Sequence, residues 1–140
     1  MFPVNSTSVE TPATARTIRV MQRTRVARDI DHAGVFACRK IAGSSRWSDH
    51  SWGAAVDLFP KPPSADDDQQ RRWIMHTVVM QATRRTIANR GRKLDIRYVI
   101  DHDAGWQWTP AEGYRAYTGA TGDHVHVSDG PAPVGVPPCA

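Results

Sequence analysis

The chain has 140 residues, which is the size of one ordinary domain and long enough to bury a proper hydrophobic core. Hydrophobic residues make up 40% of it, but no apolar run approaches the length of a membrane span, so no membrane insertion is expected. The formal net charge of +4 comes mainly from arginine, and such a surface would attract anionic wall polymers or nucleic acid.

The first 28 residues carry few structural signals. Residues 1–15 are polar and rich in serine and threonine, so we expect a flexible N-terminus, and they lack the apolar centre of a secretory signal. Residues 16–28 contain five arginines and are predicted to form either a short helix or a strand. A run of this kind is most simply a solvated face, and a binding patch is the alternative.

The segment from Ser48 to Asp57 contains a histidine and an aspartate that could share a metal ion. Asp57 follows His50 by seven positions. On a straight helix this step rises about 10 Å, and on a straight strand it exceeds about 20 Å and directs the two side chains to opposite faces. Neither arrangement brings both side chains within about 2 Å of one ion. The backbone must therefore turn between them, and Gly53 is the residue at which a turn is least costly.

Residues 65–90 carry the clearest helix pattern in the chain. Three aspartates at positions 66–68 stand at its start, where negative charge suits the helix dipole. The apolar face repeats at i+4 through Ile74, Val78 and Ala82. Gly91 is expected to end the helix.

Two strands are predicted in the second half of the chain. Residues 94–100 alternate as a half-buried strand, which is followed by a turn at residues 101–103. The run from His124 to Ser128 also alternates polar and apolar residues. As a strand it directs His124 and His126 to one face and the two valines to the core.

Together these elements predict a small α+β domain over residues 16–129, in which a small antiparallel sheet carries the metal ligands and packs against one main helix, about residues 65–90. Residues 130–140 contain four prolines and are interpreted as a tail, either a linker or a disordered end. Cys38 and Cys139 are too few for a disulfide framework. The sequence permits a bond between them, but Cys38 is most simply a buried thiol.

One histidine, one aspartate and a pair of alternate histidines form a small set of ligands for one divalent metal ion: His50, Asp57, His124 and His126. Catalytic zinc is commonly held by three protein ligands with a fourth position open. Spacing alone leaves open which of the paired histidines binds, because histidines at i and i+2 on a strand can also chelate one ion. The alternative is that these histidines only pack and form hydrogen bonds.

The pattern Ser48-x-His50-x-x-Gly53-x-Ala55-x-Asp57, followed by His124-x-His126, resembles the signature of the zinc D-alanyl-D-alanine carboxypeptidases and L-alanyl-D-glutamate endopeptidases. These enzymes share a metallopeptidase superfamily with lysostaphin-type enzymes and the hedgehog signalling domain. The runs 117–119 and 123–128 are similar to those of bacteriophage endolysins and actinobacterial cell-wall enzymes. The resemblance covers about residues 34–129.

This resemblance implies a role for each matching residue. One Zn²⁺ ion would be bound by His50, Asp57 and His126. Asp123 would be the general base, at a position where relatives commonly have glutamate, and His124 would lie beside the water at the zinc. Substrate carboxylates would be gripped by an arginine. The candidates are Arg39, which matches an arginine-supplying segment of related domains, and then Arg46, which lies four residues before His50. Ser48 is a further substrate-binding candidate, through a hydrogen bond to a ligand or substrate, and the alternative is that it caps a turn.

The implied activity is that of an endolysin-type zinc metallopeptidase that hydrolyses an amide bond in peptidoglycan peptides, as an endopeptidase or a D,D-carboxypeptidase. A zinc-activated water would attack the amide, and Asp123 would transfer its proton. Such a protein would be made in the cytoplasm without a signal peptide, act on the bacterial cell wall after release, and work as a monomer without a specific nucleic-acid partner. The alternatives are a non-catalytic cell-wall-binding module of the same fold and a metal-dependent nuclease.

Overall fold

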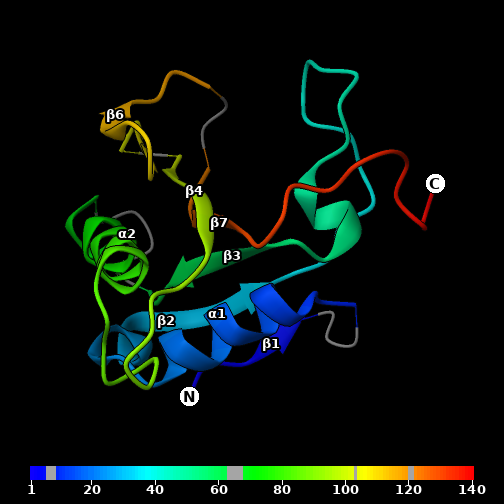
Figure 1. Ribbon diagram of the computed structural model, residues 1–140. Helices are drawn as coiled ribbons and strands as arrows, with labels where there is room; N and C mark the ends of the chain where they lie inside the picture. The colour runs from blue at the N-terminus through cyan, green and yellow to red at the C-terminus, as the bar shows by residue number, and fades with distance from the viewer. Residues whose placement is uncertain (6–8, 63–67, 103, 120–121) are drawn as a thin grey trace.

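A computed structural model describes residues 1–5, 9–62, 68–102, 104–119 and 122–140. Within these residues, seven strands form one sheet in the order β1-β2-β3-β7-β4-β5-β6 (Figure 1). In chain order the strands are β1 (Val4–Asn5), β2 (Ile30–Gly34), β3 (Ala55–Pro60), β4 (Ile96–Asp101), β5 (Trp106–Thr109), β6 (Gly113–Ala116) and β7 (Val125–Asp129). Two α-helices accompany this sheet, so the α+β class is confirmed.

The prediction of a small antiparallel sheet was wrong in both size and pairing. The sheet is mixed, because β1 runs parallel to β2 while the other neighbouring strands are antiparallel. A parallel pair needs a long crossover connection, and here a helix lies between the two strands along the chain. β1 is only two residues long, so no alternation in the sequence could indicate it.

The first helix, α1 (Pro12–Gln22), resolves the choice left open for residues 16–28. Thr11 caps it by accepting a hydrogen bond from the backbone N–H of Thr14, and Pro12 occupies the first turn, where its missing N–H costs nothing. A short 3-10 helix, η1 (Arg25–Asp29), follows and leads into β2. The N-terminal segment expected to be flexible therefore contains β1 and the start of α1.

The second helix, α2 (Asp68–Thr83), is shorter than predicted. Its predicted start at residues 65–67 lies outside the described residues. At its other end the chain leaves the helix after Thr83 and forms a tight turn, in which a bridge pairs Thr86 with Arg92 and the backbone N–H of Leu94 donates to Gln81. Gly91, with a φ of 79°, serves that turn and does not cap the helix.

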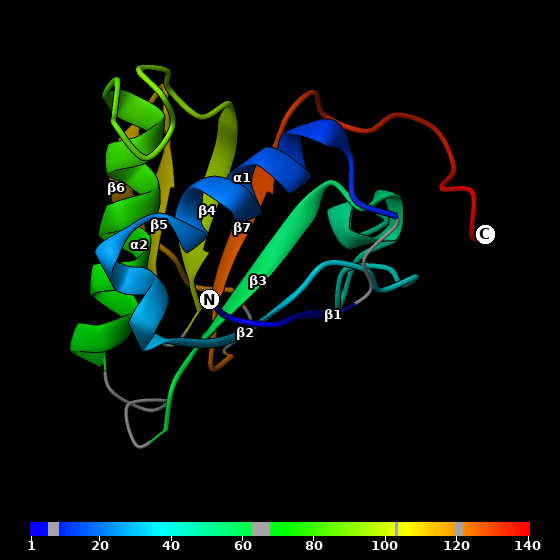
Figure 2. The same cartoon turned by 90° about the horizontal axis from the view of Figure 1, so that it is seen from below.

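Both helices cover the same face of the sheet (Figure 1, Figure 2). The core between them and the strands is aliphatic, and it includes Val56, Leu58, Ile74, Val78, Val125 and Val127. A fully buried ion pair between Arg71 of α2 and Asp101 of β4, with Nε and Oδ1 3.4 Å apart, ties the larger helix to the sheet. The sequence analysis predicted that Asp101 belongs to a turn, but Asp101 is the last residue of β4 and is buried. No helix in the described parts of the chain is long and apolar enough to span a bilayer.

A register shift in β4 changes which of its residues face the core. Ile96 opposes Asp129, but Tyr98 opposes Ser128, so β4 contains an extra residue at this point. Because side chains alternate along a strand, the bulge places Ile96 and Val99 in the core. Tyr98 is thereby directed to the opposite face, whereas simple alternation predicted that it shares a face with Ile96.

A disulfide joins Cys38 to Cys139, so the expectation of a buried Cys38 thiol was wrong. Both cysteines are exposed. The bond fixes the C-terminal segment beside the chain that precedes the short helix carrying His50. No sequence spacing indicates this pairing, because it depends on how the tail folds back.

Reduction of this disulfide is expected to lower the free energy of unfolding by about 2–4 kcal/mol, because the bond closes a long loop in the unfolded chain. The two cysteines lie 101 positions apart. Urea denaturation with and without reductant measures the change. The doubly substituted variant Cys38→Ser, Cys139→Ser is the control, and its stability should not respond to reductant.

Asp129, the last residue of β7, is buried and accepts a hydrogen bond from Thr14 of α1. Burial raises the pKa of Asp129 from 3.8 to about 6, against the opposing hydrogen bonds from Thr14 and Thr17. The folded chain therefore holds this proton more tightly than the unfolded chain does. Its contribution to stability is fully present below pH 3.8 and is lost as the pH rises through about 6.

The variant Asp129→Asn is expected to remove this pH dependence, because an amide accepts the same hydrogen bond without carrying a charge. At neutral pH the variant should be more stable than the natural chain by at most about 3 kcal/mol. Denaturation midpoints at acidic and neutral pH give the comparison. A fall in stability over the same pH range in both proteins would contradict this role for Asp129.

Candidate metal centre

Three buried side chains bring one ligand atom each to the same point: His50, Asp57 and His126. His50 Nε2 lies 3.0 Å from Asp57 Oδ1 and 3.2 Å from His126 Nδ1. The third separation, from His126 Nδ1 to Asp57 Oδ1, is 3.1 Å. In a tetrahedral zinc site with bonds of about 2.0–2.1 Å, neighbouring ligand atoms lie about 3.3 Å apart. The three atoms are therefore spaced as three corners of such a site.

The local sequence explains how His50 reaches this point. It lies in a 3-10 helix, η2 (Asp49–Trp52), whose N-terminus is capped by the Ser48 hydroxyl, which accepts from the His50 backbone N–H at 3.3 Å. Gly53 ends the helix in the left-handed conformation, with a φ of 66°. A Cβ at Gly53 would lie 2.0 Å from the Val9 carbonyl oxygen, so only glycine fits. The turn predicted at Gly53 is confirmed.

Asp57 and His126 meet because β3 and β7 are neighbours in the sheet. The two residues are direct partners in this antiparallel pair, so their side chains point to the same face. This face is opposite the helices, since Val125 and Val127 point into the core. The predicted alternation in this strand is confirmed from Val125 onward, and His124 lies just before β7 begins.

The outer hydrogen bonds fix which ring nitrogens carry protons. His50 Nδ1 lies 2.6 Å from the Val35 carbonyl oxygen, which can only accept, so the proton is on Nδ1. His126 Nε2 lies 2.7 Å from Ser128 Oγ, and that hydroxyl already donates to Asp49 Oδ2 at 2.7 Å. His126 Nε2 is therefore the donor, and its Nδ1 is unprotonated.

When both rings are neutral, two imidazole lone pairs and a carboxylate oxygen therefore converge on one point. A cation satisfies all three atoms, and outward N–H groups held by a carbonyl or a hydroxyl are the usual supports of metal-binding histidines. The donor set of two imidazoles and one carboxylate also suits zinc. His50, Asp57 and His126 therefore fit a zinc ion, because their lone pairs converge on one point.

The electrostatics of the three residues follow from burial and from one another. Burial alone would raise the pKa of Asp57, but its contacts with His126 and His50 outweigh this and hold the pKa far below its usual value. Burial lowers the pKa of His126, so this ring is neutral near pH 7. For His50, burial is outweighed by Asp57, which raises the pKa. A proton on His50 and a metal ion therefore compete for the negative charge of the Asp57 carboxylate.

The two residues proposed for catalysis lie at the edge of this cluster. His124 Nε2 is 3.5 Å from Asp57 Oδ1, and burial lowers the pKa of His124. Asp123 is 67% exposed and lies at the turn before β7, with its Oδ1 3.5 Å from His124 Nδ1. The structure thus places Asp123 beside His124, and His124 beside a ligand, and brings neither into the converging set.

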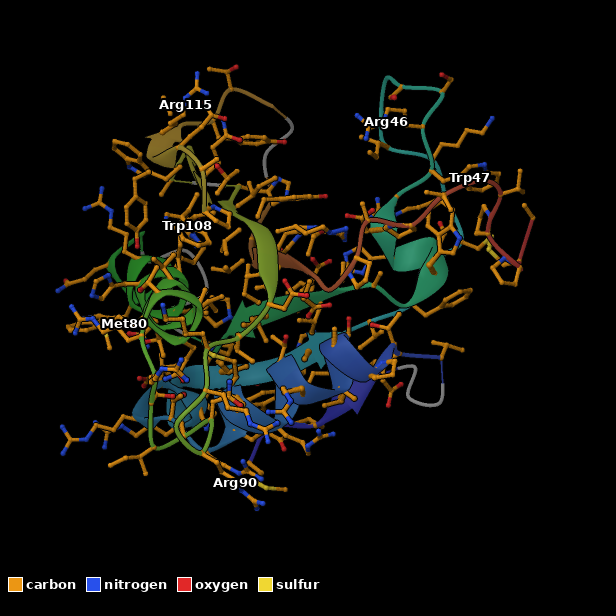
Figure 3. The ribbon with its side chains drawn as sticks, viewed as in Figure 1. Arg46, Trp47, Met80, Arg90, Trp108 and Arg115 are labelled. Atoms are coloured by element: carbon orange, nitrogen blue, oxygen red, sulfur yellow. A yellow bond between two sulfur atoms is a disulfide. The ribbon has the colours of Figure 1, made fainter. Side chains whose placement is uncertain are left out.

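The three substrate-binding candidates lie in different places. Ser48 is buried and caps the helix that carries His50, so its hydroxyl has a structural use. Arg39 is exposed, and its charge acts on the pKa of His50 after the larger effects of burial and Asp57, which places it near the metal-binding side chains. Arg46 is on the loop that extends from the sheet on one side, whereas Arg115 of β6 is on the other side (Figure 3).

Sequence reasoning missed the residues that support His126 from behind. Tyr98 stacks on the His126 ring, with ring centroids 5.4 Å apart and planes 15° apart. Asp49 accepts hydrogen bonds from Ser128, Tyr98 and Arg97. Asp49 stands next to His50 in the sequence, which was a signal, but the others are brought there only by strand pairing and the bulge in β4.

A separate groove lies on the helix face of the sheet, between α2 and β5–β6. It has a volume of about 510 Å³ and is lined by Gln69, Arg72, Trp73, Met75, His76, Trp106 and Tyr114. Trp73, Trp106 and Tyr114 are 57%, 41% and 46% exposed. The sheet separates this aromatic groove from the metal-binding side chains, because Trp106 shares its face with Asp101 and Val125.

Compared with protein-family models, with curated proteins and with solved structures, the chain gives no match.

Proposed function

We propose that the protein is a zinc metallopeptidase that hydrolyses an amide bond in peptidoglycan peptides. The observation that carries this proposal is the converging set of His50, Asp57 and His126, with both histidine tautomers fixed by outer hydrogen bonds. Three protein ligands are the usual number in a catalytic zinc site, where the fourth position is left for water or substrate. The sequence resemblance to zinc carboxypeptidases and endopeptidases independently selects the same three residues.

A bound zinc ion would supply Lewis-acid chemistry, by lowering the pKa of water and polarising a carbonyl oxygen. The chain supplies the proton transfer. Asp123 is exposed and contacts His124, which in turn contacts the ligand Asp57. In the role that the sequence resemblance implies, its carboxylate accepts the proton of the attacking water and passes it to the leaving amine. His124, between Asp123 and Asp57, orients the reacting groups.

The substrate class is supported by charge and by the disulfide. Peptidoglycan peptides carry free carboxylates, and Arg39 is an exposed guanidinium whose charge reaches His50. The Cys38–Cys139 bond persists in oxidising surroundings, which fits a protein that works on the cell wall after release from the cytoplasm. The net charge of +4 favours binding to anionic wall polymers.

Mass spectrometry of purified peptidoglycan, after incubation with the zinc-loaded protein, tests the proposal. New amino termini should appear, should vanish when the metal is chelated, and should be absent with the His126→Ala variant. The position of the new termini identifies the bond that is cut. No release from several wall types, with zinc confirmed in the protein, would overturn the peptidase. Plasmid DNA incubated with magnesium or zinc serves as the control for nuclease activity.

The aromatic groove favours a second candidate function, a non-catalytic module that binds the cell wall. Its three exposed aromatic side chains form a concave apolar surface of a kind that typically marks a binding site. Co-sedimentation of the chelated protein with insoluble peptidoglycan tests this function. The Trp73→Ala variant should bind less than the Trp47→Ala control, because Trp47 is on the separate loop labelled in Figure 3.

A further inference from the structure

Asp49 holds three donors on a single carboxylate oxygen. Its Oδ2 accepts from Ser128 Oγ at 2.7 Å, from the Tyr98 hydroxyl at 2.8 Å and from Arg97 Nη2 at 3.1 Å. None of these four residues belongs to the converging set, and two of them, Ser128 and Tyr98, contact the His126 ring. The Arg97 guanidinium balances the charge of the Asp49 carboxylate, whose side chain is only 17% exposed.

The direction of these hydrogen bonds determines the protonation of His126. A carboxylate can only accept, so the Ser128 hydroxyl points its proton at Asp49. The Ser128 oxygen then accepts from His126 Nε2, 2.7 Å away. A neutral imidazole carries one N–H, so the proton on Nε2 leaves a lone pair on Nδ1, which faces His50 and Asp57.

The same carboxylate also fixes the plane of the ring. Tyr98 stacks on His126 and is anchored by its hydroxyl to Asp49. Asp49 therefore acts on His126 in two ways, through Ser128 on the tautomer and through Tyr98 on the ring orientation. His50, in contrast, depends for its tautomer on the Val35 carbonyl and not on Asp49.

We propose that Asp49 is a positioning residue that fixes the tautomer of His126 through Ser128, and thereby sets the affinity of the site for its metal ion. The proposal rests on the metal centre of the proposed function. Alanine at position 49 tests it sharply, because it removes the oxygen that accepts the Ser128 proton. The Ser128 proton is then free to turn to His126 Nε2, which moves the ring proton to Nδ1, where it blocks the metal.

The zinc dissociation constant, measured by competition with a chromophoric chelator, is expected to rise about 10–100-fold in Asp49→Ala and in Ser128→Ala. The double variant should be no weaker than the weaker single variant, because Asp49 reaches the tautomer only through Ser128. Ser51→Ala is the matched control: its hydroxyl bonds backbone groups of residues 37 and 39, and its loss should leave zinc affinity unchanged.

A second measurement does not require metal. Histidine ¹⁵N spectra of the metal-free protein, assigned with His126→Ala, should show the proton of His126 on Nε2 in the natural chain and on Nδ1 in Asp49→Ala. An unchanged tautomer in Asp49→Ala would overturn the proposal, as would an unchanged zinc affinity. If the natural chain binds no zinc but the tautomer moves as stated, the metal centre fails and the control of His126 by Asp49 stands.

Discussion

Replacement of His126 by alanine is expected to abolish stoichiometric zinc binding. The variant removes one of three donors that lie 3.0–3.2 Å from one another, and leaves Asp57 and His50 as an incomplete pair. Mutation of a residue that only orients a metal ligand typically lowers metal affinity about 10–100-fold. Loss of a ligand itself should therefore lower the affinity for zinc by more than about 100-fold. Metal analysis after dialysis, together with chelator competition, measures the change.

The matched control for this variant is His76→Ala, which removes an exposed histidine on α2, outside the converging set. It should bind zinc as the natural chain does. The variant His124→Ala decides between the two alternate histidines, since His124 Nε2 is 3.5 Å from Asp57 Oδ1 and is absent from the converging atoms. Zinc retained by His126→Ala and lost by His124→Ala would reverse the choice of ligand.

Replacement of Asp123 by alanine is expected to reduce peptidoglycan hydrolysis about 10²–10⁴-fold while zinc stays bound. Asp123 contacts His124 and is not one of the three converging residues, so its loss removes proton transfer without removing a metal ligand. Release of new amino termini per unit time, at a fixed zinc content, is the quantity to compare. Undiminished turnover in this variant would exclude Asp123 from the mechanism.

Two controls make the result specific. Asp31→Ala removes another exposed aspartate that contacts a neighbouring histidine, His32, and should leave hydrolysis unchanged. Asp123→Glu keeps a carboxylate and should retain much of the activity. If alanine and glutamate at position 123 are equally inactive, the requirement is for the shape of the turn and not for the carboxylate.

Much of the candidate metal centre could be predicted from local sequence patterns. His50 and Asp57 can share an ion only if the backbone turns between them, and Gly53 is where the backbone turns. The alternation after His124 predicts that Val125 and Val127 face the core while His126 faces away, as observed. These features depend on neighbours within a few positions, so the sequence contains them.

Other features depend on contacts between distant segments, and only the tertiary structure decided them. The extra residue in β4 turns Tyr98 toward His126, because a bulge reverses the alternation that the sequence pattern indicates. The parallel pairing of β1, the end of α2 at Thr83 and the Cys38–Cys139 bond likewise result from the way distant parts of the chain pack.

Spacing in the sequence left both His124 and His126 as ligands, and the structure brings His126 to Asp57 because the two are direct partners across β3 and β7. The sequence by itself therefore determined which residue types stand at which turns and strands. The folded chain decided which of them meet, because strand register and hydrogen-bond direction exist only after the strands have paired.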